Sequence, residues 1–206
     1  MTAPRPTPGA VPHEPLAAEV RARFLGHLGA TIWLTGLPAS GKTTIALALE
    51  RALLSQGRPA FVLDGDTLRH GLSAGLSFDA AGRAEAVRRA GEAALLLAQS
   101  GAVAIASLVS PYRADRNAVR ARHASARIPF LEAFVDVELA VAAARDPKGH
   151  YKKALAGELP GFTGVSDPYE APASPELRLT TATMTVDECV QATLVGLSRC
   201  GGFGSR

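Results

Sequence analysis

Residues 36–43 read Gly36-Leu37-Pro38-Ala39-Ser40-Gly41-Lys42-Thr43, which fits the pattern G-x-x-x-x-G-K-T. Residues 30–35 precede them as an apolar, β-branched run that predicts a buried strand, and residues 44–50 follow with a sequence typical of a helix. A glycine-rich loop between a strand and a helix directs backbone N–H groups at one point, where they favour an anion. The sequence therefore predicts a phosphate-binding loop that holds a nucleoside triphosphate.

The fixed positions of this loop each have a chemical reason. Gly36 and Gly41 let the backbone approach a phosphate without a Cβ clash. Lys42 can reach the β- and γ-phosphates, and the Thr43 hydroxyl is a candidate ligand for Mg²⁺. The predicted nucleotide-binding residues of this segment are Gly36, Leu37, Pro38, Ala39, Ser40, Gly41, Lys42, Thr43 and Thr44.

The composition predicts one α/β domain, because 47% of the 206 residues are hydrophobic and supply a full core. Basic residues exceed acidic ones by only three, despite a pI of about 9.1, so nucleic-acid binding is not indicated. Cys189 and Cys200 match no metal spacing and are expected to be reduced thiols. The sequence shows no apolar leader and no run of membrane-spanning length, so we expect a cytoplasmic protein without a membrane partner.

Strand and helix patterns alternate along the chain. Residues 1–15 hold five prolines and predict a disordered tail, 16–200 a single domain, and 201–206 a flexible tail. Further strands are predicted at 59–64, 102–107, 130–136 and 176–180, and helices at 16–28, 82–100, 113–122 and 185–199, the last opened by a capping box from Thr185 to Glu188. This order predicts a parallel sheet covered by helices on both faces, with the site at the carboxyl ends of its strands.

Two acidic residues follow the strand at 59–64, as Asp64-Gly65-Asp66, whereas the strand at 102–107 ends at Ser107 without an acid. Carboxylates at this place suit an enzyme that deprotonates an acceptor hydroxyl and holds Mg²⁺. An ordinary Asp-Gly turn is the alternative interpretation.

Cations and glycines gather at residues 145–164. Arg145 and Lys148 lie there among Gly149, Gly157, Gly161 and Gly164. Cations on a glycine-hinged flap can close over phosphates and exclude water, which predicts a mobile lid at about 145–165. A solvated helix face is the alternative, and for Lys152 and Lys153 it is the preferred interpretation.

The chain resembles the adenosine 5′-phosphosulfate kinase (adenylylsulfate kinase) family from about residue 30 to residue 177. The blocks that carry this resemblance are Gly36 to Thr44, Leu63-Asp64-Gly65-Asp66, Ser110-Pro111-Tyr112-Arg113-Ala114-Asp115-Arg116, Arg145-Asp146-Pro147-Lys148-Gly149-His150-Tyr151 and Gly161-Phe162-Thr163-Gly164. The resemblance implies a P-loop nucleotide-kinase fold with a mobile lid, and a homodimer. It also implies transfer of the γ-phosphate from ATP, with Mg²⁺, to the ribose 3′-hydroxyl of adenosine 5′-phosphosulfate.

The resemblance also assigns roles. Asp66 matches the base, with Asp64 supporting it and the metal; Lys42 is catalytic, and Lys148 lies near the transferred phosphoryl group. For the acceptor, it assigns Arg69 and Arg83 to the phosphosulfate and Phe78 and Phe162 to the two faces of the adenine. Arg145 is expected on the ATP side. Ser110 matches a phosphoserine position, although a Ser before Pro at a strand end equally predicts a backbone-binding turn residue.

Four positions depart from the family pattern, and they keep the acceptor open. The family carries Asp, Asn, Asn and Gly where this chain has Gly82, Ala86, Thr67 and Ser77. A lost amide contact costs about 0.5–1.5 kcal/mol, which does not exclude the parent reaction. Two alternatives therefore remain: a kinase of the same mechanism with a different nucleotide-like acceptor, and a non-catalytic nucleotide-binding module. Intact Lys42, Thr43, Asp66, Arg83 and Lys148 disfavour the second.

Overall fold

The computed structural model describes residues 16–201 of the chain. The predicted tails at 1–15 and 201–206 lie outside this range, except for Gly201. The described residues form a five-stranded sheet in the order β2-β3-β1-β4-β5, in which every neighbouring pair is parallel. The strands are β1 (Ala30–Thr35), β2 (Ala60–Asp64), β3 (Val103–Ser107), β4 (Phe130–Asp136) and β5 (Leu177–Thr180). The predicted parallel α/β architecture is confirmed.

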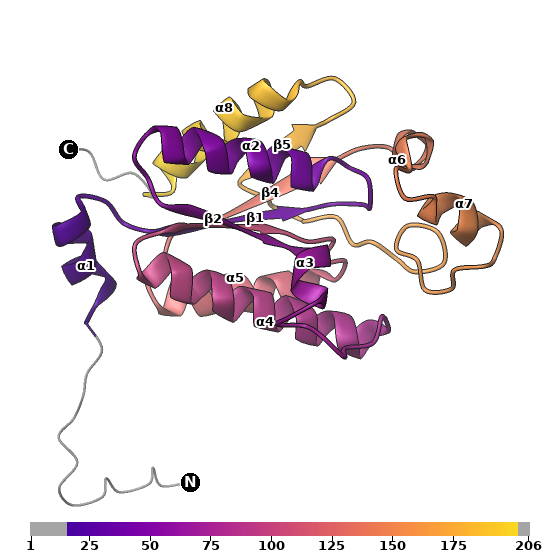
Figure 1. The fold of residues 1–206 in the computed structure, drawn as a ribbon, viewed down its shortest axis with the longest axis horizontal. Coiled ribbons are helices and arrows are strands. Elements are labelled where there is room, and N and C mark those ends of the chain that lie inside the picture. The colour runs from indigo at the N-terminus through magenta and orange to yellow at the C-terminus, as the bar shows by residue number, and fades with distance from the viewer. Residues whose placement is uncertain (1–15, 202–206) are drawn as a thin grey trace, which may run out of the picture.

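Helices cover both faces of the sheet (Figure 1). The helices α2 (Lys42–Ser55) and α8 (Val186–Arg199) pack on one face, and α4 (Ala80–Gln99) and α5 (Arg113–Ser125) on the other. β1 is central and all six of its residues are buried, with Ile32 and Leu34 in the core under α2 and α8 and Trp33 in the core under α4 and α5. The alternation of side chains along a strand explains why one β-strand contributes to both cores.

The predicted strands are close to the observed ones, whereas several helix bounds are corrected. α1 (Ala18–Leu25) is shorter than the predicted 16–28, because Gly26 takes a left-handed φ of 77° and ends it. α4 begins at Ala80 rather than at Gly82, because the Asp79 carboxylate caps the helix by accepting from Gly82 N at 2.7 Å. α2 and α5 extend beyond their predicted ends, and the capping box of α8 is confirmed.

Three short helices were not predicted at all. They are α3 (Gly65–Arg69), α6 (Leu139–Arg145) and α7 (His150–Leu155). In Figure 1, α6 and α7 project beyond the end of the sheet. Among the described residues no helix is long and apolar enough to cross a membrane. Cys189 and Cys200 are both free thiols, as expected.

Candidate active site

The phosphate-binding loop connects β1 to α2 with the geometry that its glycines predict. A Cβ on Gly36 would lie only 2.4 Å from the carbonyl oxygen of Val135, so no larger residue fits. Gly41 takes a φ of 100°, which favours glycine, and caps α2. The helix therefore begins at Lys42, and its first N–H groups are directed at the loop.

Lys42 is buried at the centre of the loop. Its Nζ donates to the carbonyl oxygens of Gly36 (3.0 Å) and Leu37 (2.7 Å). Burial lowers the pKa of Lys42 to about 7, although the carboxylates of Asp64 and Asp66 oppose the shift. An incoming phosphate supplies the negative charge that restores the ammonium form.

Three residues form an oxygen-rich site beside Lys42: Thr43 in the first turn of α2, and Asp64 and Ser107 at the carboxyl ends of β2 and β3. Thr43 Oγ1 donates to Asp64 Oδ2 at 2.9 Å and lies 3.3 Å from Ser107 Oγ. The other oxygen of Asp64 accepts from the backbone N–H groups of Asp66 and Thr67 and caps α3. Ser107, which sequence reasoning treated only as the end of a strand, thus belongs to the site.

The donor set of this site fits Mg²⁺. Mg²⁺ prefers oxygen ligands and binds through one or two carboxylates together with substrate phosphates and water. Thr43 and Asp64 supply a hydroxyl and a carboxylate next to the phosphate loop. Among residues 16–201, no cluster of three or more His, Cys, Asp or Glu side chains could hold a metal by itself. The chemistry favours an ion shared with a nucleotide over a permanent all-protein cage.

Asp66 lies in the first turn of α3, one residue beyond Gly65, with its side chain 74% exposed. It forms an ion pair with Lys148, which lies between α6 and α7. The structure therefore joins the predicted base and the predicted lid lysine. Lys152 and Lys153 are exposed, in agreement with the surface role preferred for them.

The two predicted acceptor arginines lie close together. Arg69 Nη1 donates to the carbonyls of Leu76 (2.9 Å) and Ser77 (3.1 Å), and its guanidinium lies 4.2 Å from the centroid of the Phe78 ring. Burial and then the positive charge of Arg83 lower the pKa of Arg69. Two neighbouring guanidinium groups favour a bound anion between them.

Arg83 also holds the lid in this structure. Its guanidinium donates to Gly161 O and Thr163 Oγ1 and pairs with Asp167 at 3.3 Å. The neighbouring Phe162 is half-buried and packs edge-on against Tyr151, at 4.9 Å between ring centroids. An open cavity of about 470 Å³ is lined by residues 164–169, with Leu37 and Leu139.

Phe78 and Ala86 lie at the two ends of residues 78–86, the segment that also carries the predicted acceptor residue Arg83. The Phe78 ring is 68% exposed, and its carbonyl accepts from Arg83 Nε at 2.7 Å. Ala86 is buried on α4. Gly82 has no room for a side chain, because its Cβ would lie 2.3 Å from Ser77 O. The unusual residues at 77 and 82 are therefore in direct contact.

Arg145 lies where the nucleotide side of the loop is expected. Its guanidinium donates to the hydroxyl oxygen (3.1 Å) and to the carbonyl oxygen (2.7 Å) of Thr181. Thr181 Oγ1 in turn donates to Ser40 O in the phosphate loop at 2.9 Å. Thr181 was missed by sequence reasoning, although its position just after β5, at the carboxyl end of a parallel strand, could have indicated it.

Ser110 lies apart from these residues, in a buried network. It is 3% exposed, and its Oγ accepts from Trp33 Nε1 at 3.1 Å and lies 3.0 Å from Thr35 Oγ1. Its φ of 38° is unusual for serine. These contacts favour the interpretation of Ser110 as a turn residue. Trp33 and His123 are fully buried, and both rings pack against Phe130 in the core.

The chain belongs to the adenylylsulphate kinase family, whose model matches residues 28–180. The adenylyl-sulfate kinase of Saccharomyces cerevisiae is 51% identical over 177 residues, which are 86% of this chain and 88% of that protein. Among solved structures, the Mycobacterium tuberculosis APS kinase CysC in complex with AMPPNP and APS has a TM-score of 0.81 and 46% identity, covering 84% of this chain and 99% of that one.

A second solved structure bears on assembly. The hexameric APS kinase from Thiobacillus denitrificans has a TM-score of 0.65 and 33% identity, and the match covers 86% of this chain but 30% of that one. Both structural matches agree with the P-loop kinase fold described above.

Proposed function

We propose that this member of the adenylylsulphate kinase family transfers the γ-phosphate of ATP to the ribose 3′-hydroxyl of adenosine 5′-phosphosulfate. One observation carries the proposal: Asp66 lies between the Thr43–Asp64 oxygen pair and Lys148, while two neighbouring arginines, Arg69 and Arg83, supply an anion site. A base, a phosphoryl-binding lysine and an acceptor anion site are the three parts that transfer to a nucleotide hydroxyl needs.

On the ATP side, the phosphate loop and Lys42 bind the triphosphate. Thr43 and Asp64 would hold Mg²⁺, which neutralises charge on the phosphates when it is bound. Arg145 contacts the loop through Thr181 and Ser40, so we assign it to the nucleotide side of the site. Together, these residues hold the γ-phosphate in place for an in-line attack by the acceptor hydroxyl.

On the acceptor side, Asp66 accepts the proton of the attacking hydroxyl. Its carboxylate is exposed and paired with Lys148, so it is accessible to a substrate that enters under the lid. As the proton leaves, the acceptor oxygen forms a bond to the γ-phosphorus and the bond to the ADP oxygen breaks. Lys148 is then placed to offset negative charge on the transferred group.

The adenine of the acceptor stacks on Phe78 and Phe162. Phe78 offers an exposed ring backed by the Arg69 guanidinium, and Phe162 belongs to the segment that Arg83 holds. Closing the lid brings the Phe162 ring over the second face of the adenine and excludes water. The phosphosulfate then lies toward Arg69 and Arg83, which exchange their present contacts for the anion.

The acceptor is tested by measuring ADP release with a panel of nucleotides that carry different 5′ groups and sugar hydroxyls. Adenosine 5′-phosphosulfate should be the best substrate, and Ala86→Asn should change its KM by no more than about tenfold. If another nucleotide is preferred and Ala86→Asn reverses the preference, the second candidate is correct: a kinase of the same mechanism with a changed acceptor. No ADP release with any acceptor would support a non-catalytic module.

Assembly and location complete the proposal. We assign the chain to a homodimer, as the family resemblance implies, and light scattering against the alternative of a hexamer tests this. A cytoplasmic location agrees with two free thiols and is tested by fractionation of the native host.

A further inference from the structure

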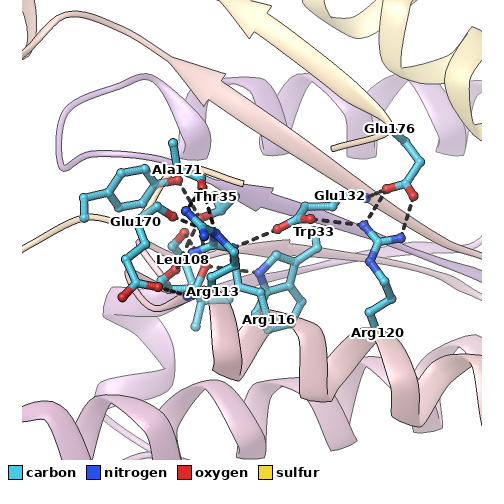
Figure 2. Close-up of polar contacts among 12 residues, drawn as sticks. Trp33, Thr35, Leu108, Arg113, Arg116, Arg120, Glu132, Glu170, Ala171 and Glu176 are labelled. Atoms are coloured by element: carbon cyan, nitrogen blue, oxygen red, sulfur yellow. Dashed lines mark hydrogen bonds and ion pairs between the residues drawn. The ribbon is translucent and has the colours of Figure 1, made fainter. Parts of the chain in front are cut away.

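A network of buried polar groups lies beside the site, between β1, α5 and the chain that follows the lid. Its centre is Arg116, which is 1% exposed. Arg116 donates in three directions: Nε to Glu132 Oε1 at 2.8 Å, Nη1 to Ser110 O at 2.6 Å and Nη2 to Glu170 O at 2.6 Å. Figure 2 shows Arg116 with Glu132 on one side and Glu170 on the other. One side chain thus joins three separate segments.

One branch of the network reaches the root of the phosphate loop. Thr35 is the last residue of β1 and precedes Gly36 directly. Its Oγ1 donates to Val109 O at 2.8 Å and lies 3.0 Å from Ser110 Oγ. The carbonyl of the same Ser110 accepts from Arg116, so the position of Thr35 depends on Arg116 through one intermediate residue.

The other branch fixes the chain just after the lid. Glu170 N donates to Pro111 O at 2.9 Å, and Glu170 Oε2 accepts from Arg113 N at 2.8 Å. Arg113 also donates to Ala171 O at 3.1 Å (Figure 2). The two branches meet directly, because the Tyr169 hydroxyl lies 3.0 Å from Thr35 Oγ1.

The segment that precedes this anchor is held differently. Residues 161–167 make their polar contacts with the rest of the chain through Arg83, whose partners are Gly161 O, Thr163 Oγ1 and Asp167. Phe162 and Val165 also pack against the apolar cluster around Tyr151. Gly161 and Gly164, which have left-handed φ values of 67° and 92°, lie at the end of the lid, shortly before the anchor. Within a few residues, the chain therefore passes from contacts with Arg83, which the proposed function assigns to the acceptor, to a contact with the fully buried Arg116.

We propose that Arg116 is a positioning residue that makes residues 169–171 the fixed pivot of the lid and sets the root of the phosphate loop at the same time. The inference rests on the proposed function. One guanidinium holds both the end of the lid and the start of the phosphate loop. The lid therefore closes in a constant position over the γ-phosphate and excludes water from it. Arginine suits this task because its planar group directs donors along three fixed lines, which a lysine ammonium on a flexible stem does not reproduce.

The experiment measures the ratio of two rates in the purified full-length protein: ADP release from Mg-ATP without acceptor, and ADP release with adenosine 5′-phosphosulfate. The first rate reports water taking the place of the acceptor hydroxyl at the γ-phosphorus. A smaller folded fraction lowers both rates equally, so the ratio is insensitive to a merely structural defect. Arg116→Lys should raise this ratio about 10- to 100-fold, since a displacement of about 1 Å costs transfer by that order.

Arg120→Lys is the matched control. Arg120 also lies on α5 and also donates to Glu132, at 3.1 Å, but its other carboxylate partner is Glu176, outside both branches. Its ratio should stay within about twofold of the wild-type value. Tyr169→Phe is the second test, because it keeps the ring and removes only the hydroxyl that faces Thr35; it should raise the ratio about two- to fivefold.

The outcomes separate the two proposals. A wild-type protein that transfers no phosphate to this acceptor contradicts the proposed function. A wild-type protein that transfers normally, with unchanged ratios in Arg116→Lys and Tyr169→Phe, contradicts the pivot, as does an equal rise in Arg120→Lys. If Arg116→Lys does not fold, Tyr169→Phe decides alone.

Discussion

Two ion pairs in this chain have the same chemistry and opposite surroundings. The Arg116 and Glu132 side chains are 1% and 7% exposed, whereas those of Lys148 and Asp66 are 55% and 74% exposed. A buried pair is costly to break because each charge is left without water, while an exposed pair exchanges partners at little cost. The difference separates a permanent framework behind the phosphate loop from contacts that are free to change during a reaction cycle.

The largest expected effect comes from the exposed pair and concerns rate. Asp66→Asn should lower turnover by about 10²–10⁴, the usual range for loss of a general base, while ATP binding is preserved. Steady-state kinetics and a nucleotide titration of the same preparation test this. Normal turnover in the variant would exclude Asp66 as the base.

The buried pair should show the opposite behaviour, a large effect on stability. Glu132→Gln leaves Arg116 without its carboxylate and should lower the free energy of unfolding by about 3–5 kcal/mol. Urea unfolding measures the loss, with Lys148→Met as the comparison from the exposed pair, where we expect less than about 1 kcal/mol. Equal losses in the two variants would remove the distinction between the regions.

The Phe78 ring, on which the acceptor adenine is proposed to stack, should give a smaller effect, on the affinity for the acceptor only. Phe78→Ala should weaken acceptor binding by about 1–3 kcal/mol for the lost stack, because the ring is exposed and backed by Arg69. ATP affinity should change little. Calorimetric titration with each ligand measures both, and equal losses for the two ligands would argue against stacking at this ring.

The smallest effect is the uptake of a proton by Lys42, in the phosphate loop, when a triphosphate binds. Burial lowers its pKa to about 7, so the free protein carries mostly neutral Lys42 at pH 8.5, whereas a bound triphosphate favours the ammonium form. Binding of ATP at that pH should therefore take up to about one proton, and affinity should fall as pH rises above 7. Calorimetry in buffers of different ionisation enthalpy measures the uptake.

The same shift predicts how the stability of the ligand-free protein responds to pH. The unfolded chain keeps Lys42 protonated up to about its usual pKa of 10.5, and the folded chain releases the proton near 7. The unfolded state thus binds more protons between these values, so this residue makes folding more favourable as pH rises through the window. Lys42→Met should remove that part of the pH dependence.

Much of the framework could be predicted because its signals are local. The strands at 30–35 and 130–136 have continuous apolar runs, and the structure has them at those bounds. The phosphate loop and the capping box at Thr185 are likewise written in a few adjacent residues. Local patterns determine these elements, so tertiary context had little to override.

The lid helices and several site residues could not be predicted, since their reasons are tertiary. α7 has only six residues, and its Tyr151 hydroxyl donates to Pro38 O in the phosphate loop, 113 positions away. Ser107 and Thr181 have no sequence signal beyond their strand ends. Arg116 lies on a helix rich in arginine, and only the fold distinguishes the buried Arg116 from the more exposed Arg113 and Arg120.

Trp33 is the single tryptophan of the sequence, fully buried, and its indole N–H donates to Ser110 Oγ at 3.1 Å. Indole emission depends on the polarity and hydrogen bonding around the ring. Trp33 fluorescence therefore reports on the surroundings of Ser110, where the network from Arg116 reaches the start of the phosphate loop. Fluorescence of the unmodified chain can therefore follow nucleotide binding, and a change in emission maximum that tracks ligand would come from this one position.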